Sequence, residues 1–149
     1  MQAQMLAPAA VLVFWSIIML VWMAGTRFPA MAKSNVDLKN GPPGGRGQDL
    51  EAVLPREVQW KSHNYAHLME QPTIFYPTVI ILAMMGANGL DVALAWAYVA
   101  IRILHSIWQA TVNRIPVRFL MFLLSTLALA VLALRALSMT VFAGTDLIQ

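Results

Sequence analysis

Long blocks of apolar residues, separated by short polar stretches, dominate the pattern along the chain. Four blocks stand out, at residues 6–31, 57–85, 91–112 and 115–142. Each block is longer than the roughly 20 residues that a helix needs to cross the hydrocarbon core of a bilayer. The pattern therefore predicts an all-α integral membrane protein, with residues 1–149 forming a single membrane domain of four spanning helices.

The connections between the blocks indicate how the helices are arranged. The first connection, 33–55, contains the segment 41–47, which reads Gly-Pro-Pro-Gly-Gly-Arg-Gly. Such a segment is typical of a flexible or irregular loop. The other two connections are short, with Asn88-Gly89 as the turn in one and Pro116 in the first turn after the other. Because short connections join antiparallel neighbours, we expect an up-down-up-down bundle.

The basic residues predict the orientation of this bundle in the membrane. Near the first connection lie Arg27, Lys33, Lys39, Arg46, Arg56 and Lys61, and at the third lie Arg114 and Arg118. The second connection and the N-terminal tail carry no basic residue. The positive-inside rule places the basic loops in the cytoplasm and both termini outside, as in a bacterial inner membrane. We interpret the first block as a retained helix rather than a cleaved signal peptide, because no basic residue precedes it.

Composition agrees with a membrane protein and excludes several other classes. Of the 149 residues, 59% are hydrophobic and 11% are charged, whereas soluble domains carry about a quarter charged residues. The net charge of +3 does not indicate a nucleic-acid partner, because the basic residues flank helices and are not interleaved with aromatic residues. The absence of cysteine excludes disulfides, thiolate metal sites and a cysteine nucleophile.

Ionisable and polar residues inside two of the blocks are the main candidates for function. They are His63, His67 and Glu70 in the second block, and Arg102, His105 and Gln109 in the third. The spacings are i, i+4, i+7 and i, i+3, i+7, so each set lies on one helical face. Such side chains are costly in lipid and normally face a protein interior or a wet cavity. We therefore expect a polar site between these helices that opens toward the cytoplasm.

Several interpretations of this site remain open. Glu70 is expected to pair with Arg102 on the facing helix, and the site is either a hydrogen-bond network that holds the helices or a pocket for a polar or anionic ligand. We do not expect a metal site, although histidine and glutamate, which occur in the second block, are residue types that bind metals. A proton pathway is a further alternative, weakened because the polar residues occupy only one half of the bundle. Pro72 and Pro77 predict a kink beside Glu70.

Two arginines stand at the start of the fourth block. Arg114 and Arg118 are four residues apart, where a positive charge opposes the helix dipole. One interpretation makes both of them anchors on the cytoplasmic side of the membrane. The other turns Arg118 inward toward a carboxylate or a thiolate, which a guanidinium binds well.

These motifs carry a resemblance to a known family. The stretch 64–77, the sequence Arg-Ile-Leu-His at 102–105 and the segment 114–118 together resemble the MAPEG family, the membrane-associated proteins in eicosanoid and glutathione metabolism. The family includes microsomal glutathione transferase and prostaglandin E synthase, and the resemblance covers residues 60–135. It implies a four-helix protomer of a homotrimer, with glutathione bound between protomers near the cytoplasmic side.

The resemblance also implies roles for individual residues. It makes Arg118 the catalytic residue that holds the thiolate. The implied glutathione-binding residues are His63, His67, Glu70, Arg102, His105, Gln109 and Arg118. Four of them match the family, whereas His63, His67 and Gln109 stand where the family has Arg, Asn and Tyr. Phe119 and Phe122 occupy positions where Ser and Tyr are common, so hydroxyl donors that would stabilise a thiolate are missing.

The expected function is that of a glutathione-dependent transferase or peroxidase acting on lipophilic substrates. The alternative is a non-catalytic accessory subunit of a larger membrane complex, or a lipid- or ligand-binding protein on the same scaffold. Membrane lipid is an expected partner in either case.

Overall fold

The computed structural model describes residues 1–37, 40–41 and 43–143. Its helices are α1 (Gln2–Lys33), the 3-10 helix η1 (Gly47–Ala52), α2 (Arg56–Leu68), α3 (Pro72–Met85), α4 (Gly89–Thr111) and α5 (Ile115–Val141). Within these residues there is no strand, and four helical segments are long and apolar enough to cross a membrane, with α2 and α3 forming one of them. The expected all-α membrane bundle is therefore confirmed.

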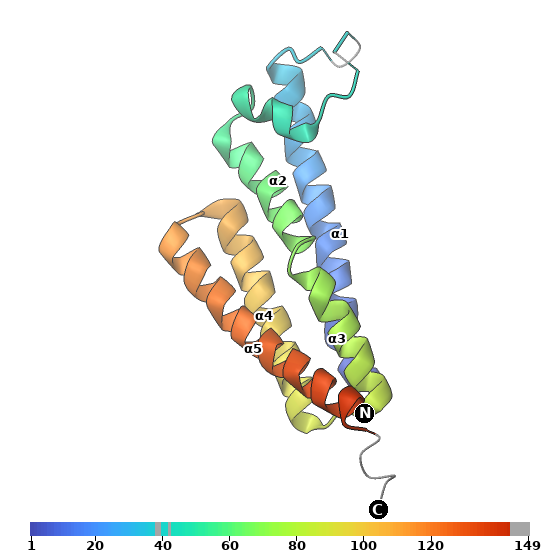
Figure 1. Ribbon diagram of the computed structural model, residues 1–149. Helices are drawn as coiled ribbons and strands as arrows, with labels where there is room; N and C mark the ends of the chain where they lie inside the picture. The colour runs from blue at the N-terminus through green and yellow to red at the C-terminus, as the bar shows by residue number, and fades with distance from the viewer. Residues whose placement is uncertain (38–39, 42, 144–149) are drawn as a thin grey trace, which may run out of the picture.

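The helices alternate in direction, as the short connections predict (Figure 1). The segment that contains η1 and the turn between α4 and α5 lie at one end of the bundle, which we call the loop end. The N-terminus and the turn between α3 and α4 lie at the opposite end. The 3-10 helix lies in the connection that the sequence predicts as a loop, and residues 38, 39 and 42 of that connection lie outside the described part of the chain.

The turn between α3 and α4 shows why these helices end where they do. Gly86 has φ +94° and ends α3, and the Ala87 amide donates to the Leu82 carbonyl at 2.9 Å. Asn88 then caps α4, with its side chain accepting from the Asp91 amide at 3.0 Å while the Asp91 carboxylate accepts from the Asn88 amide at 2.9 Å. The turn predicted here is confirmed, and Asp91 places a negative charge in the first turn of α4.

The second spanning segment is broken in the middle. Pro72 has no amide hydrogen for the Leu68 carbonyl, so α2 ends at Leu68 and α3 begins at Pro72. The kink predicted here is confirmed, whereas α3 continues through Pro77 without a second break. As a result the two halves have different neighbours: α2 packs on α1 and α4, and α3 packs on α1 and α5.

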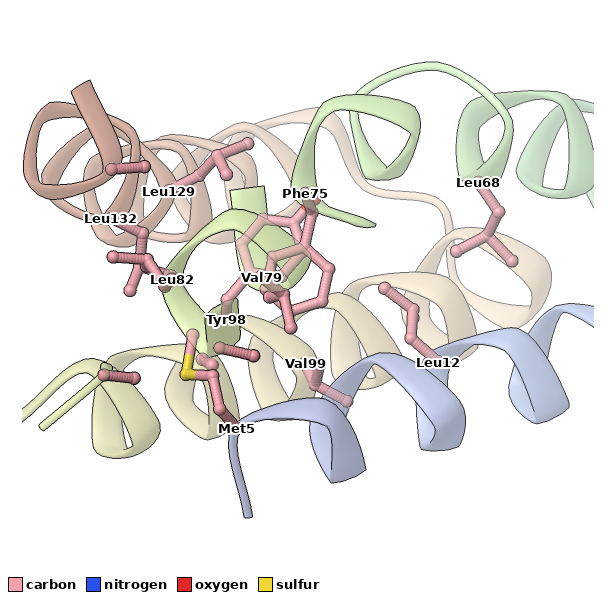
Figure 2. Packing of buried hydrophobic residues seen from close by; sticks show 14 of the residues in the cluster. Met5, Leu12, Leu68, Phe75, Val79, Leu82, Tyr98, Val99, Leu129 and Leu132 are labelled. Atoms are coloured by element: carbon pink, nitrogen blue, oxygen red, sulfur yellow. The ribbon is translucent and has the colours of Figure 1, made fainter. Parts of the chain in front are cut away.

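The core lies along the centre of the bundle (Figure 2). Met5, Leu12 and Met19 recur every seven residues on α1 and are fully buried. The rings of Phe75 and Tyr98 stack with centroids 4.3 Å apart and join α3 to α4. Many large apolar side chains remain exposed on the outer faces of the helices, as expected for surfaces that contact lipid.

Candidate functional site

A hollow of about 190 Å³ opens near the loop end of the bundle, where α2 ends between α4 and the first turns of α5. Its lining consists of His67 from α2, His105 from α4, and Ile115, Arg118, Phe119 and Phe122 from α5. The helix break accounts for its position, because α2 packs mainly on α1 and α4, whereas its continuation α3 packs on α5. The two imidazoles thus come from α2 and α4, whereas α5 supplies the guanidinium of Arg118 together with the aromatic and apolar side chains.

Arg102 is fully buried and is not among the residues that line the hollow, but it contacts one of them, His67. Its Nη2 atom donates to two atoms of His67, the ring Nδ1 at 3.1 Å and the backbone carbonyl at 3.0 Å. A positive charge is favourable at the C-terminus of α2, where the last carbonyls have no partner in their own helix. The Nε and Nη1 atoms of Arg102 are also buried, and they have no hydrogen-bond partner among the described residues. Arg102 therefore holds the end of α2 and still has two buried donor atoms, Nε and Nη1, that can bind another group.

The predicted ion pair between Glu70 and Arg102 is wrong. The ionisable side chain that Glu70 approaches is His67, with 3.9 Å between Oε2 and Nε2, and the Glu70 side chain is 68% exposed. The physical reason is the helix break. Glu70 follows the end of α2, so the helical face that carries His67 does not continue to it. Glu70 lies next to His67 but outside the residues that line the hollow, a position that we call its rim, and Arg102 bonds to the helix end.

The two imidazoles of the site pack on each other. The rings of His67 and His105 stack with centroids 4.9 Å apart, and the edge of Phe122 contacts His67 at a centroid distance of 5.7 Å. His105 is only 2% exposed. The ring of His67 is thus held on two sides and at Nδ1.

Arg118 lines the hollow, which is the position that the second interpretation of the arginine pair requires. Its Nη1 donates to Asn113 Oδ1 at 2.7 Å. Asn113 has φ +54°, a left-handed conformation that asparagine tolerates, and its amide donates to the Trp108 carbonyl at 2.8 Å as α4 ends. One residue therefore closes α4 and positions Arg118. Arg114 is exposed at the start of α5.

His63 and Gln109 do not join this site. His63 Nε2 lies 2.8 Å from the Oε1 atom of Glu51 in η1, so it binds the first connection. Gln109 is buried and does not line the hollow, and its Oε1 has no partner in the portion of the chain described. The described residues contain no group of three metal-ligand side chains placed to share an ion. The structure brings together His67, Arg102, His105 and Arg118, with Glu70 at the rim.

A second polar cluster was not predicted from the sequence. Ser106 Oγ accepts hydrogen bonds from Trp15 Nε1 at 3.0 Å and from Asn64 Nδ2 at 2.7 Å, and so joins α1, α2 and α4. Ser106 and Asn64 adjoin the histidines in sequence but lie on the buried faces of their helices. Their polarity within apolar blocks was the signal that could have found them.

The fold and the site together define a four-helix membrane protein with a cationic hollow between its helices. Comparison with known families identifies the family to which this protein belongs. The model of the MAPEG family matches residues 5–138, and the chain belongs to the MAPEG family. No curated protein and no solved structure gives a significant match to the chain.

Proposed function

We propose that this protein is a glutathione-dependent transferase or peroxidase that acts on lipophilic substrates at the membrane. The observation that carries the proposal is Arg118, whose guanidinium is held by Asn113 at the wall of an open hollow. A cation in a partly desolvated site lowers the pKa of a nearby thiol and favours the thiolate. Such a thiolate is the nucleophile in both reactions.

The neighbouring groups suit the charged ends of glutathione, which has two carboxylates and one ammonium group. Arg102 has buried donor atoms with no partner among the described residues, and in this proposal a bridging water connects them to a carboxylate in the hollow. Glu70 is exposed at the rim and suits the ammonium group. The aromatic wall of Phe119 and Phe122 suits an apolar second substrate that reaches the hollow from the bilayer.

The exposure of Glu70 supports a homotrimer with the site between protomers. Glu70 is 68% exposed although it lies within a membrane-spanning segment. A carboxylate that faces lipid tails is costly, so protein or a water-filled cavity must cover it. In the proposed assembly a neighbouring protomer supplies this cover. In the proposed orientation, the loop end lies in the cytoplasm of a bacterium, both termini lie outside, and glutathione reaches the hollow from the cytoplasm.

In the proposed reaction the residues of this chain bind and orient glutathione and the lipophilic substrate. Glutathione supplies the nucleophilic sulfur, Arg118 holds that sulfur as the thiolate, and Arg102 and Glu70 orient the charged ends. The apolar wall places the electrophilic atom of the lipophilic substrate beside the sulfur and excludes water.

Turnover of a chromogenic aromatic electrophile with glutathione tests this proposal. The purified wild-type protein should form the conjugate, and Arg118→Ala should lower the rate at least tenfold because the thiolate loses its cation. Arg114→Ala is the matched control, since Arg114 is exposed four residues earlier, and it should retain the rate. A wild-type protein with no turnover, or a fully active Arg118→Ala variant, would contradict the proposal.

The second candidate is a non-catalytic accessory subunit or a lipid-binding protein on this scaffold. Phe119 and Phe122 favour it, because they give the hollow no hydroxyl donor. It predicts that purification in mild detergent retains either a larger membrane complex or a bound lipid, which mass spectrometry would identify. Recovery of a ligand-free homotrimer alone would count against it.

A further inference from the structure

The protonation pattern of His67 follows from its contact with Arg102. A guanidinium has only donors, so the ring Nδ1 that lies 3.1 Å from Arg102 Nη2 must accept. In a neutral imidazole the hydrogen then resides on Nε2. A hydrogen on Nδ1 would point at the guanidinium, so this contact disfavours the other tautomer.

The ring orientation is fixed by packing as well as by the hydrogen bond. His105 stacks on one face of His67, and Phe122 contacts it edge-on. The side chain of His67 is 25% exposed and lines the hollow. Its Nε2 lies 3.9 Å from Glu70 Oε2, which is beyond hydrogen-bond distance. The Nε2–H group is therefore a fixed donor with no close acceptor among the described residues.

We infer that Arg102 holds His67 in its Nε2–H tautomer, and that this hydrogen is donated to the glutathione thiolate in the hollow, where Phe119 and Phe122 provide no hydroxyl. The inference rests on the proposed function, because it assigns one contact within the same site. His67 binds the anion and removes no proton, since Nδ1 is occupied by Arg102. The thiol proton passes to water, and the sulfur lone pair accepts from His67 while Arg118 supplies the positive charge.

The tautomer can be tested without any ligand. Long-range ¹H–¹⁵N correlation spectra of the ¹⁵N-labelled protein in detergent micelles distinguish protonated from unprotonated ring nitrogens. His67→Gln identifies the His67 signals by their loss. We expect an unprotonated Nδ1 and a protonated Nε2 for His67. A hydrogen on Nδ1 would overturn the inference whatever the protein binds.

The contact to the thiolate is tested by comparing glutathione with S-methylglutathione, which has no ionisable sulfur. At a pH where the bound thiol is ionised, His67→Phe should weaken glutathione binding about tenfold more than S-methylglutathione binding. Loss of the Nδ1 acceptor of Arg102 affects both ligands alike, whereas loss of the Nε2 donor affects only the thiolate. His67→Gln should retain most of the affinity for glutathione, since the amide nitrogen of the glutamine places N–H donors near the position of the His67 Nε2 atom. The control Arg114→Ala, at an exposed position where α5 begins, should change neither ligand.

The outcomes separate this inference from the function on which it rests. Equal weakening of both ligands, or no change in His67→Phe, would overturn the donor role while glutathione binding still supports the proposed function. A wild-type protein that binds neither ligand would overturn the proposed function and the thiolate contact together. The spectra would then still report whether Arg102 selects the tautomer.

Discussion

Arg102 donates from a single atom, Nη2, to both the ring Nδ1 and the backbone carbonyl of His67. The contact joins the middle of α4 to the last turn of α2, just before the break at Pro72. It places a buried cation where the helix dipole favours one. It also leaves Nε and Nη1 of this arginine without a partner among the described residues, beside the hollow.

Glu70 is expected to matter for binding and little for stability. Its side chain is 68% exposed, and the only ionic partner it has among the described residues, His67, lies 3.9 Å away. Glu70→Gln should weaken glutathione binding about tenfold through loss of a charge-assisted hydrogen bond to the ammonium group. The unfolding midpoint of the variant in denaturing detergent should match that of the wild type. Unchanged affinity would remove Glu70 from the binding site.

Ser106→Ala is expected to destabilise the bundle. Ser106 is fully buried, and its loss leaves Trp15 Nε1 and Asn64 Nδ2 without their acceptor. The free energy of unfolding should fall by about 1–2 kcal/mol, as measured by denaturing-detergent titration. Thr111→Ala is the control, since that exposed hydroxyl bonds only to the Ile107 carbonyl in its own helix. Equal stability of the two variants would show that the cluster does not hold α1, α2 and α4 together.

The pair of Asp91 and Arg135 is expected to hold the other end of the bundle. Asp91 is fully buried, and Arg135 binds both of its carboxylate oxygens. Arg135→Gln should lower the melting temperature clearly, because it leaves a buried carboxylate unpaired. Adding Asp91→Asn should restore part of the loss, since an amide needs no counter-charge. A double variant no more stable than the single one would argue against a specific pair.

The orientation in the membrane can be tested directly because the chain has no cysteine. Gln48 in η1 and Leu90 at the start of α4 are both exposed and lie at opposite ends of the bundle. In intact cells a membrane-impermeant maleimide should label Leu90→Cys, and it should label Gln48→Cys only after permeabilisation. The reverse pattern would invert the proposed topology.

Much of the fold was predictable, because apolar runs of spanning length leave few alternatives in a membrane. Short connections gave the antiparallel order, and Pro72 gave the position of the break. The partner of Arg102 was not predictable in the same way. Helical spacing assigned Glu70 to the face of His67, but the chain leaves the helix between Leu68 and Pro72 and carries Glu70 off that face.

Contacts between distant residues account for most of the polar pairs that the sequence did not predict. Asp91 and Arg135 are 44 positions apart, and Ser106 lies 91 positions from Trp15. Such pairs depend on the rotation of each helix about its axis, which local patterns constrain weakly. Asn113 stands directly before the arginine pair, and the tolerance of asparagine for positive φ marks it as a residue that can end a helix.

Calorimetric titration of the purified protein with glutathione tests the central claim most directly, namely that the hollow between α2, α4 and α5 binds this peptide through its arginines. The account predicts saturable binding to the wild type and to Arg114→Ala, and at least tenfold weaker binding to Arg118→Ala. Absence of binding to the wild type, or equal affinity in all three proteins, would contradict it.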